Sequence, residues 1–343
     1  MNQSTNRQWR LARRPVGMVK ESDFEYREEP LPRPSDGEIL VRNLYISFDP
    51  AMRGWMEDRK SYIPPVGIGD VMRASGVGQV VESKLAGFAP GDFVQGLFGW
   101  QEWTIAGSGL RAPQKIAPGT PLTWHLGVLG LTGLTAYFGL LDLGKPKAGE
   151  TVLVSGAAGA TGSVVAQIAK HVVGCRTVGI AGGREKCAWL TRELGLDAAI
   201  DYKQGDVQRQ VGELCPQGVH VYFDNVGGEI LDAALFHIAE RARIVLCGGI
   251  SGYNEKEPPP GPRNLMNLVT RRGRMEGFIV IDYAARFGEA AKDLAGWARA
   301  GKIQHRDDLQ HGIENAPRTF LRLFRGENTG KQLLQVGEPP IRV

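Results

Sequence analysis

The chain has 343 residues, of which 42% are hydrophobic and 23% charged, and its formal net charge is +4. This length suffices for a large buried core and favours two domains over one. The small net charge, spread along the chain, argues against nucleic acid as a partner.

No membrane segment is expected. The first twenty residues are rich in arginine but hold no continuous apolar core, so they do not resemble a signal peptide. The uncharged apolar stretch Leu126–Leu141 has 16 residues and four glycines. A helix needs about 20 apolar residues to cross a bilayer. We therefore expect a cytoplasmic protein.

The first third of the chain is rich in short strand patterns and turn residues. Strands are predicted at 8–16, 37–48 and 74–84, and a strand pair at 91–106 around Gly96 and Gly99. This pattern predicts a compact, mostly β domain.

From about residue 127, strands alternate with helices. The predicted strands are 151–155, 176–181, 197–201, 219–224, 242–247 and 274–281. The predicted helices are 163–173, 184–194, 206–214, 229–240 and 284–301, and 255–263 is a proline-rich loop. Such alternation predicts an α/β fold with a doubly wound parallel sheet covered by helices on both faces.

The last 40 residues return to a short strand, a helix and a strand. We expect them to complete the N-terminal domain. The predicted domains are thus 1–126 completed by 303–343, and 127–302.

The segment 151–162, Thr-Val-Leu-Val-Ser-Gly-Ala-Ala-Gly-Ala-Thr-Gly, is the most informative in the chain. A strand that leads through a glycine turn into a helix brings a diphosphate to the helix N-terminus. Ala157 stands at the first glycine position of the usual G-x-G-x-x-G spacing, so the motif departs from the consensus. A strand-to-helix glycine turn without a nucleotide remains the alternative.

The end of the second strand of this domain predicts the cofactor. In NAD-binding folds an acidic residue about 20 residues after the glycine turn binds the adenosine ribose. Here that position holds glycine, and Arg184 and Lys186 follow. Arginine and lysine recognise phosphate, so the sequence favours NADP over NAD. The alternative is that both are simply exposed helix residues.

No metal is expected. The four cysteines, at 175, 187, 215 and 247, include no C-x-x-C pair, and the six histidines form no H-E-x-x-H motif. Disulfides are not expected in a cytoplasmic chain of this size.

The chain resembles the zinc-free branch of the medium-chain dehydrogenase/reductase superfamily, and within it the prostaglandin reductase family and its bacterial curcumin and 2-alkenal reductase members. Motifs from end to end carry the resemblance: NRQWRLARRPVG, SFDPAMRGWM, GLTGLTAYFGLLDLGKPKAGETVLVSGAAGATG, FDNVGG, CGGISGYN, PPPGPRNL and MEGFIV. It implies a Rossmann-type domain and a GroES-like domain. One departure is Ala51, where the family usually has tyrosine.

The resemblance also implies a set of NADP contacts. Gly159, Ala160, Thr161 and Gly162 would hold the diphosphate, with Lys186 on the 2′-phosphate and Tyr202 at the adenosine end. Asn225 would lie near the ribose and diphosphate. The nicotinamide side would be lined by Cys247, Gly248, Ile250, Ser251 and Tyr253. The carboxamide would be contacted by Phe278, Ile279 and Val280. Asn328 would reach the cofactor from the C-terminal segment.

The implied activity is NADPH-dependent reduction of the C=C bond in α,β-unsaturated ketones and aldehydes. Negative charge moves to the carbonyl oxygen, so the site needs a hydrogen-bond donor there and a proton source. Tyr253 is the first candidate and Tyr62 the second, because a phenol stays protonated at neutral pH. The structural alternatives are that Tyr253 only stacks on the nicotinamide or braces its loop, that Tyr62 packs before a turn, and that Asn225 is a turn residue. The ribose hydroxyl of the cofactor could also donate in place of Tyr253.

Two other functions remain open at this stage. A quinone oxidoreductase of the same superfamily would share the cofactor site, and an NADPH-binding sensor would bind without turnover. The resemblance implies a small-molecule enone or enal substrate and a homodimer, with neither nucleic acid nor a membrane as partner.

Overall fold

The computed structural model describes residues 5–338, which divide into two compact units. Among the described residues, one unit comprises 5–126 with 307–338, and the other Gly127–Arg306. Within residues 5–338 we find no helix whose length and hydropathy would let it span a bilayer.

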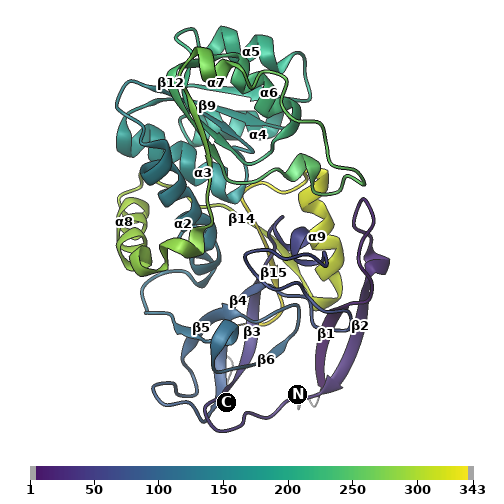
Figure 1. Cartoon of the computed structure of the whole chain (residues 1–343). Coiled ribbons are helices and arrows are strands. Elements are labelled where there is room, and N and C mark those ends of the chain that lie inside the picture. Colours follow the sequence, from purple (N-terminus) through teal and green to yellow (C-terminus); the bar gives the residue numbers. More distant parts are fainter. Residues whose placement is uncertain (1–4, 339–343) are drawn as a thin grey trace. The chain divides into compact units, whose positions relative to one another are not determined.

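The first unit is built on a mostly antiparallel sheet with the strand order β14-β15-β3-β4-β5-β7, and β6 also pairs with β3 (Figure 1). A separate hairpin joins β1 to β2. The elements are β1 Thr5–Leu11, β2 Phe24–Pro30, β3 Ile39–Ser47, α1 Met52–Trp55, β4 Ser75–Ser83, β5 Phe93–Leu97, β6 Trp103–Ala106, β7 Gln114–Lys115, β14 Asp307–His311, α9 Ala316–Arg325 and β15 Lys331–Gln335. Short 3-10 turns are η1 Glu21–Asp23, η2 Gly109–Arg111, η3 Leu122–Leu126 and η9 Ile313–Asn315.

An aromatic core ties the C-terminal segment into this unit. Trp100 is fully buried, with ring centroids 4.9 Å from Phe24, 5.0 Å from Phe48 and 5.5 Å from Phe320 of α9. Three aromatic residues from the first hundred positions thus pack on a helix more than 200 residues later. Their burial explains why the C-terminal strands join the N-terminal sheet, where β15 pairs antiparallel with β3.

The second unit contains a sheet with the order β10-β9-β8-β11-β12-β13, in which every neighbouring pair is parallel. Its strands are β8 Thr151–Ser155, β9 Arg176–Ala181, β10 Ala198–Asp201, β11 Val219–Asp224, β12 Ile238–Leu246 and β13 Arg274–Gly277. All five residues of β8 are buried, as expected for a central strand covered on both faces. The predicted doubly wound α/β fold is confirmed.

Helices connect these strands. They are α2 Leu131–Phe138, α3 Ala160–Gln167, α4 Arg184–Ala188, α5 Val207–Leu214, α6 Gly228–Phe236, α7 Asn267–Thr270 and α8 Phe287–Arg299. The π-helical segments η4 Gly139–Gly144, η5 Ile168–Val173 and η6 Trp189–Glu193 extend α2, α3 and α4, and η7 Ile250–Gly252 and η8 Val280–Arg286 are 3-10 helices. From β8 the strand order runs outward in both directions, so right-handed crossovers place α3 and α6 on opposite faces.

Several predicted boundaries are wrong. The helix predicted at 229–240 ends at Phe236, because Ile238 already pairs with Val219 as the start of β12. The strand predicted at 274–281 ends at Gly277, where the Phe278 ring turns toward Tyr283 at a centroid distance of 6.4 Å. Tertiary pairing and ring packing override the local pattern in both places.

Differences also occur in the first unit. The first strand lies at Thr5–Leu11 instead of 8–16 and forms a hairpin with β2, which the sequence pattern did not reveal. The two strands predicted within 91–106 exist, but β5 pairs with β4 and β7, while β6 pairs with β3. Helix α2 was also missed, because Gly133 and the buried apolar residues around it mask a helical period.

A buried ion cluster stabilises the sheet of the first unit. The Glu102 side chain is 1% exposed and accepts hydrogen bonds from Arg7 at 2.6 and 2.8 Å and from Arg42 at 3.0 Å. Burial alone would raise the pKa of Glu102, but the bonds and charges of the two arginines outweigh it and hold the pKa below 4.5.

Replacing Glu102 by glutamine is expected to lower the free energy of unfolding by about 3 kcal/mol, because Arg42 would keep its buried charge without a counter-ion. Since the pKa of Glu102 is depressed in the folded state, its contribution is complete above pH 4.5 and is lost as the pH falls through the folded-state value. Urea unfolding at pH 7 and at acidic pH would measure both effects.

The control is Glu213→Gln, which removes an exposed ion pair with Arg209 on α5. We expect it to cost less than about 0.5 kcal/mol. Equal losses for the two variants would contradict a special role for the buried cluster.

Candidate active site

The glycine turn after β8 has the shape of a phosphate cradle. Gly156 has a φ of +57°, and α3 begins at Ala160 directly after Gly159. A Cβ at Gly162 would lie 2.3 Å from the carbonyl oxygen of Gly156, so only glycine lets the helix approach the turn this closely. A Cβ at Gly159 would meet only that same oxygen, at 3.2 Å. The first-turn N–H groups of α3 therefore fit a diphosphate.

A buried hydrogen-bond network joins this turn to the end of β11. Asp224 is 1% exposed, and its Oδ1 accepts bonds from Ser155 Oγ at 2.8 Å and Tyr222 OH at 2.7 Å. The same oxygen accepts the backbone N–H groups of Val226 and Gly227, each at 3.0 Å. Burial, followed by the Asp224 charge, raises the pKa of Tyr222 well above 10, so the phenol stays a donor.

Asn225 is held by the same network. Its Nδ2 donates to the Ser155 carbonyl at 2.7 Å, and its backbone N–H donates to Ser155 Oγ at 2.9 Å. The predicted cofactor residue therefore bridges β11 to the strand that carries the glycine turn. Ser155 and Asp224 were missed at the sequence level, where the available signal was a polar residue closing each of two buried apolar strands.

The loop after β12 carries the residues predicted for the nicotinamide side. The N–H groups of Cys247 and Gly248 donate to the Asp224 carbonyl at 2.9 and 3.1 Å, and that of Ile250 donates to the Asn225 carbonyl at 3.3 Å. Ser251 donates twice to the Val226 carbonyl, from its backbone at 3.1 Å and its hydroxyl at 2.6 Å. The loop is thus tied to the end of β11.

Two side chains in this loop have distinct chemistry. The hydroxyl oxygen of Tyr253 accepts a hydrogen bond from the Gly249 N–H at 3.2 Å, a contact that braces the loop. Burial, followed by the charge of Asp224, raises the pKa of the Cys247 thiol to about 12. Since the thiolate is the nucleophilic form, this environment disfavours nucleophilic chemistry at Cys247 at neutral pH.

Phe278, Ile279 and Val280 follow the end of β13, at the same edge of the sheet. The Phe278 ring lies close to Gly139 of η4, where a Cβ would approach it to 2.6 Å. This packing fixes the Phe278 side chain.

The ends of β9 and β10 carry the residues predicted for the adenosine end. Tyr202 is 43% exposed, and its ring lies against Gly182, where a Cβ would approach it to 2.7 Å. Lys186 lies in α4, the helix that follows β9. A depression of about 490 Å³ is lined by Arg184, Cys187, Ala199, Asp201, Gln204 and Gln210. The lining holds the guanidinium group of Arg184 and the carboxylate of Asp201, whose Oδ1 accepts the N–H groups of Gly183 at 2.8 Å and Lys203 at 3.0 Å.

The structure brings the predicted residues of the second unit to one edge. They follow the carboxyl ends of β8, β9, β10, β11, β12 and β13, and these ends share an edge because the strands are parallel. The crossovers diverge between β8 and β11, where open α/β sheets bind their ligands. The glycine turn and Asn225 lie at this point.

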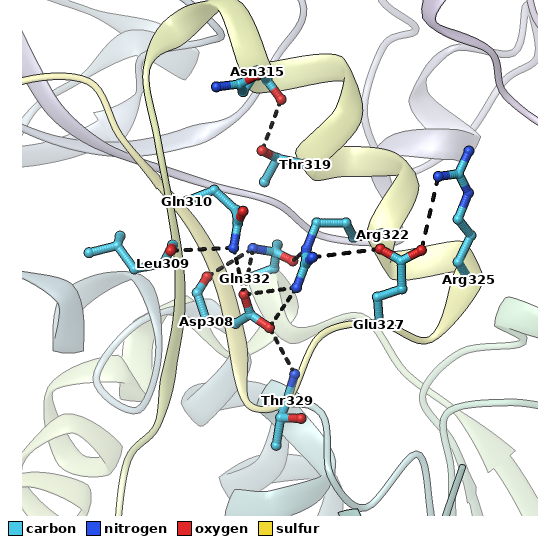
Figure 2. A network of polar contacts seen from close by, with 10 residues as sticks. All are labelled: Asp308, Leu309, Gln310, Asn315, Thr319, Arg322, Arg325, Glu327, Thr329 and Gln332. Atoms are coloured by element: carbon cyan, nitrogen blue, oxygen red, sulfur yellow. Dashed lines mark hydrogen bonds and ion pairs between the residues drawn. The ribbon is translucent and has the colours of Figure 1, made fainter. Parts of the chain in front are cut away.

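Asn328 lies in the first unit, in the loop between α9 and β15, where its Nδ2 donates to the Gly330 carbonyl at 3.1 Å. Figure 2 shows the network that holds this loop. Arg322 binds both carboxylate oxygens of Asp308 at 3.1 Å, and Asp308 Oδ2 accepts the Thr329 N–H at 3.1 Å. The loop is therefore anchored at the residue that follows Asn328.

Tyr62 also lies in the first unit, in the loop between α1 and β4, and is 45% exposed. Its hydroxyl accepts a hydrogen bond from Trp55 Nε1 at 2.7 Å. Burial raises the pKa of Tyr62, so its phenol stays protonated. Ala51 lies one turn before Trp55, which bonds back to its carbonyl at 3.3 Å.

Among residues 5–338, no group of three or more His, Cys, Asp and Glu side chains is arranged to hold a metal ion.

Two family models match the chain. The model described as the N-terminal domain of oxidoreductase covers residues 7–112, and the one described as zinc-binding dehydrogenase covers residues 160–296. Among curated proteins, a Bacillus subtilis protein named as an NADP-dependent oxidoreductase is 48% identical over 98% of this chain and 99% of its own. The NADPH-dependent curcumin reductase of Escherichia coli is 43% identical over 96% of this chain and 97% of its own.

A solved structure is similarly close. CurA from Vibrio vulnificus, in complex with NADPH, is 43% identical and has a TM-score of 0.92, covering 97% of this chain and 100% of that one.

Replacing Gly162 by alanine is expected to lower the free energy of unfolding by about 2 kcal/mol, because the new methyl group would overlap the Gly156 carbonyl. Thermal unfolding would measure the loss. Gly159→Ala is the control, since its contact of 3.2 Å requires only a small shift. Equal stability of Gly162→Ala and the parent chain would refute the close approach.

Proposed function

The chain belongs to the zinc-independent branch of the medium-chain dehydrogenase/reductase family, and from that premise we propose an NADPH-dependent reductase of the C=C bond in α,β-unsaturated ketones and aldehydes. The observation that carries this proposal is the combination of a diphosphate cradle after β8 with basic residues at the end of β9. Curcumin, the substrate in the name of one relative, contains conjugated enones.

NADP is the cofactor. When bound, NADPH supplies a hydride for the β-carbon of the substrate. We assign the diphosphate to Gly159–Gly162 and the 2′-phosphate to Lys186 and Arg184. We assign Tyr202 to the adenosine end and Asn225 to the ribose and diphosphate. The remaining cofactor contacts are Cys247, Gly248, Ile250, Ser251, Tyr253, Phe278, Ile279, Val280 and Asn328.

The chain's own contribution to the reaction is positioning and hydrogen bonding. Reduction at the β-carbon moves negative charge to the carbonyl oxygen, and a donor preorganised at that oxygen lowers the barrier. The α-carbon then takes a proton. Tyr253 is proposed as the proton source and Tyr62 as the carbonyl donor, since a neutral phenol can serve in either role.

The family resemblance also supports a homodimer located in the cytoplasm. We propose both. Sedimentation equilibrium of the purified protein would test the dimer, and a mass equal to one chain at micromolar concentration would contradict it.

Replacing both Arg184 and Lys186 by glutamine is expected to weaken NADPH binding at least about 10-fold and to leave NADH binding unchanged. A charge-assisted hydrogen bond to phosphate contributes about 1.5–3 kcal/mol, and NADH lacks the 2′-phosphate. Titration of cofactor fluorescence with both nucleotides measures the effect. The control is Arg192→Gln, an exposed residue of η6. A parallel loss for NADPH and NADH would argue against phosphate recognition.

Replacing Tyr253 by phenylalanine is expected to lower kcat for an enone by more than about 10-fold, which corresponds to roughly 1.4 kcal/mol of barrier. The measurement is NADPH oxidation with an enone, a 2-alkenal and a naphthoquinone. A smaller drop would argue against Tyr253 as the proton source and would leave it the structural role of bracing its loop. Turnover of the quinone alone would instead identify a quinone oxidoreductase, and no turnover would identify a binding protein.

A further inference from the structure

Trp55 and Tyr62 form a hydrogen-bonded aromatic pair in the first unit. The indole Nε1 lies 2.7 Å from the phenol oxygen, and both side chains are partly exposed. An indole N–H can only donate, so the phenol oxygen is the acceptor. The phenol's own proton is therefore not used in this contact and remains for an acceptor on the exposed side.

The backbone beneath this pair is anchored at both ends. At the start of α1, the buried Nζ of Lys331 donates to Asp49 Oδ1 at 2.6 Å, and the Asp49 carbonyl accepts the Met52 N–H at 3.0 Å. At the base of the Tyr62 loop, the Val66 N–H donates to the Trp55 carbonyl at 2.7 Å. Such anchoring preorganises the two side chains.

Arg14 binds the backbone at both ends of the loop that carries Tyr62. Its Nη1 donates to the Met56 carbonyl at 2.6 Å and to the Val66 carbonyl at 3.1 Å. The two ends of the loop that carries Tyr62 are thus held together by one guanidinium group.

A cation lies over the indole. The guanidinium of Arg73 is 5.8 Å from the Trp55 ring centroid, and its Nη1 donates to the Pro64 carbonyl at 2.7 Å. Arg73 therefore links the ring to the Tyr62 loop and adds positive charge beside the phenol. The link holds the Tyr62 phenol in place, and the positive charge beside it favours donation of its hydrogen bond to an oxygen that gains negative charge.

We propose that Trp55 is a positioning residue that aims the Tyr62 hydroxyl at the carbonyl oxygen of the enone, and that its ring selects substrates with a flat, extended conjugated system. The inference rests on the proposed enone reduction and adds a residue and a substrate preference to it. An indole beside the donor offers a π-face on which an aryl enone stacks, whereas a short aliphatic enone gains little from it.

The hydrogen bond is tested by a double-mutant cycle. Trp55→Phe keeps an aromatic ring but removes the N–H, and Tyr62→Phe removes the hydroxyl. With 4-phenyl-3-buten-2-one as substrate, we expect each single variant to lose about 10-fold in kcat, with little change in KM. The double variant should lose no more than Tyr62→Phe alone. Multiplied losses would show that the two residues act independently and would overturn the positioning role.

The substrate preference is tested with Trp55→Leu, which removes the aromatic face. We expect kcat/KM for 4-phenyl-3-buten-2-one to fall at least 5-fold more than kcat/KM for methyl vinyl ketone. Equal losses on the two substrates would overturn the selectivity.

Trp9→Phe is the matched control, because Trp9 Nε1 also donates a hydrogen bond, at 2.8 Å to the Ile313 carbonyl. If Trp55→Phe and Trp9→Phe had the same effect on kcat, the loss would be structural and the proposal wrong. Thermal unfolding and NADPH titration of every variant separate misfolding from a loss of positioning. Failure of the parent chain to reduce either enone would refute the proposed function itself. Normal reduction by Trp55→Phe would refute only this inference.

Discussion

The proposed cofactor site depends on the hydrogen bonds that the buried carboxylate of Asp224 accepts. A buried polar group is costly unless it is hydrogen-bonded, and here Oδ1 accepts bonds from two side chains and two backbone N–H groups, while Oδ2 has no hydrogen-bond partner among the described residues. Because the donors come from β8, from β11 and from the turn after β11, the bonds to Oδ1 also align two strand ends. Asn225 and the loop after β12 are positioned by bonds to the same residues.

The first unit depends on contacts between distant parts of the sequence. The buried amine of Lys331 in β15 binds Asp49 after β3, and Phe320 of α9 packs on Trp100. The loop between α9 and β15, which carries Asn328, is fixed by the pairing of Arg322 with Asp308. Each contact joins the C-terminal segment to a residue of the sheet or its neighbouring turns, so both proposed ligand-contacting segments of this unit rest on one core.

Local sequence patterns predicted a strand or turn correctly where the residues of that segment alone indicate whether it is buried. The fully buried β8 and the glycine turn after it were predicted correctly, because the Val-Leu-Val run of this strand is recognisable without knowing its partner strands. The boundary between α6 and β12 was wrong, because Ile238 becomes a strand residue only through its pairing with Val219. Helix α2 was missed for a related reason, since burial on most sides removes the amphipathic period.

The amino-acid sequence by itself determined the strand–helix alternation, the glycine turn, and the basic residues in place of an acid after β9. These depend on residue type and spacing over a few positions, which local sterics and charge make readable. Only the tertiary structure decided that Ser155 would share the Asp224 carboxylate, or that Trp55 would donate to Tyr62. Such pairs depend on strand order and loop closure, which come from burying the whole core and cannot be seen in any short window of sequence.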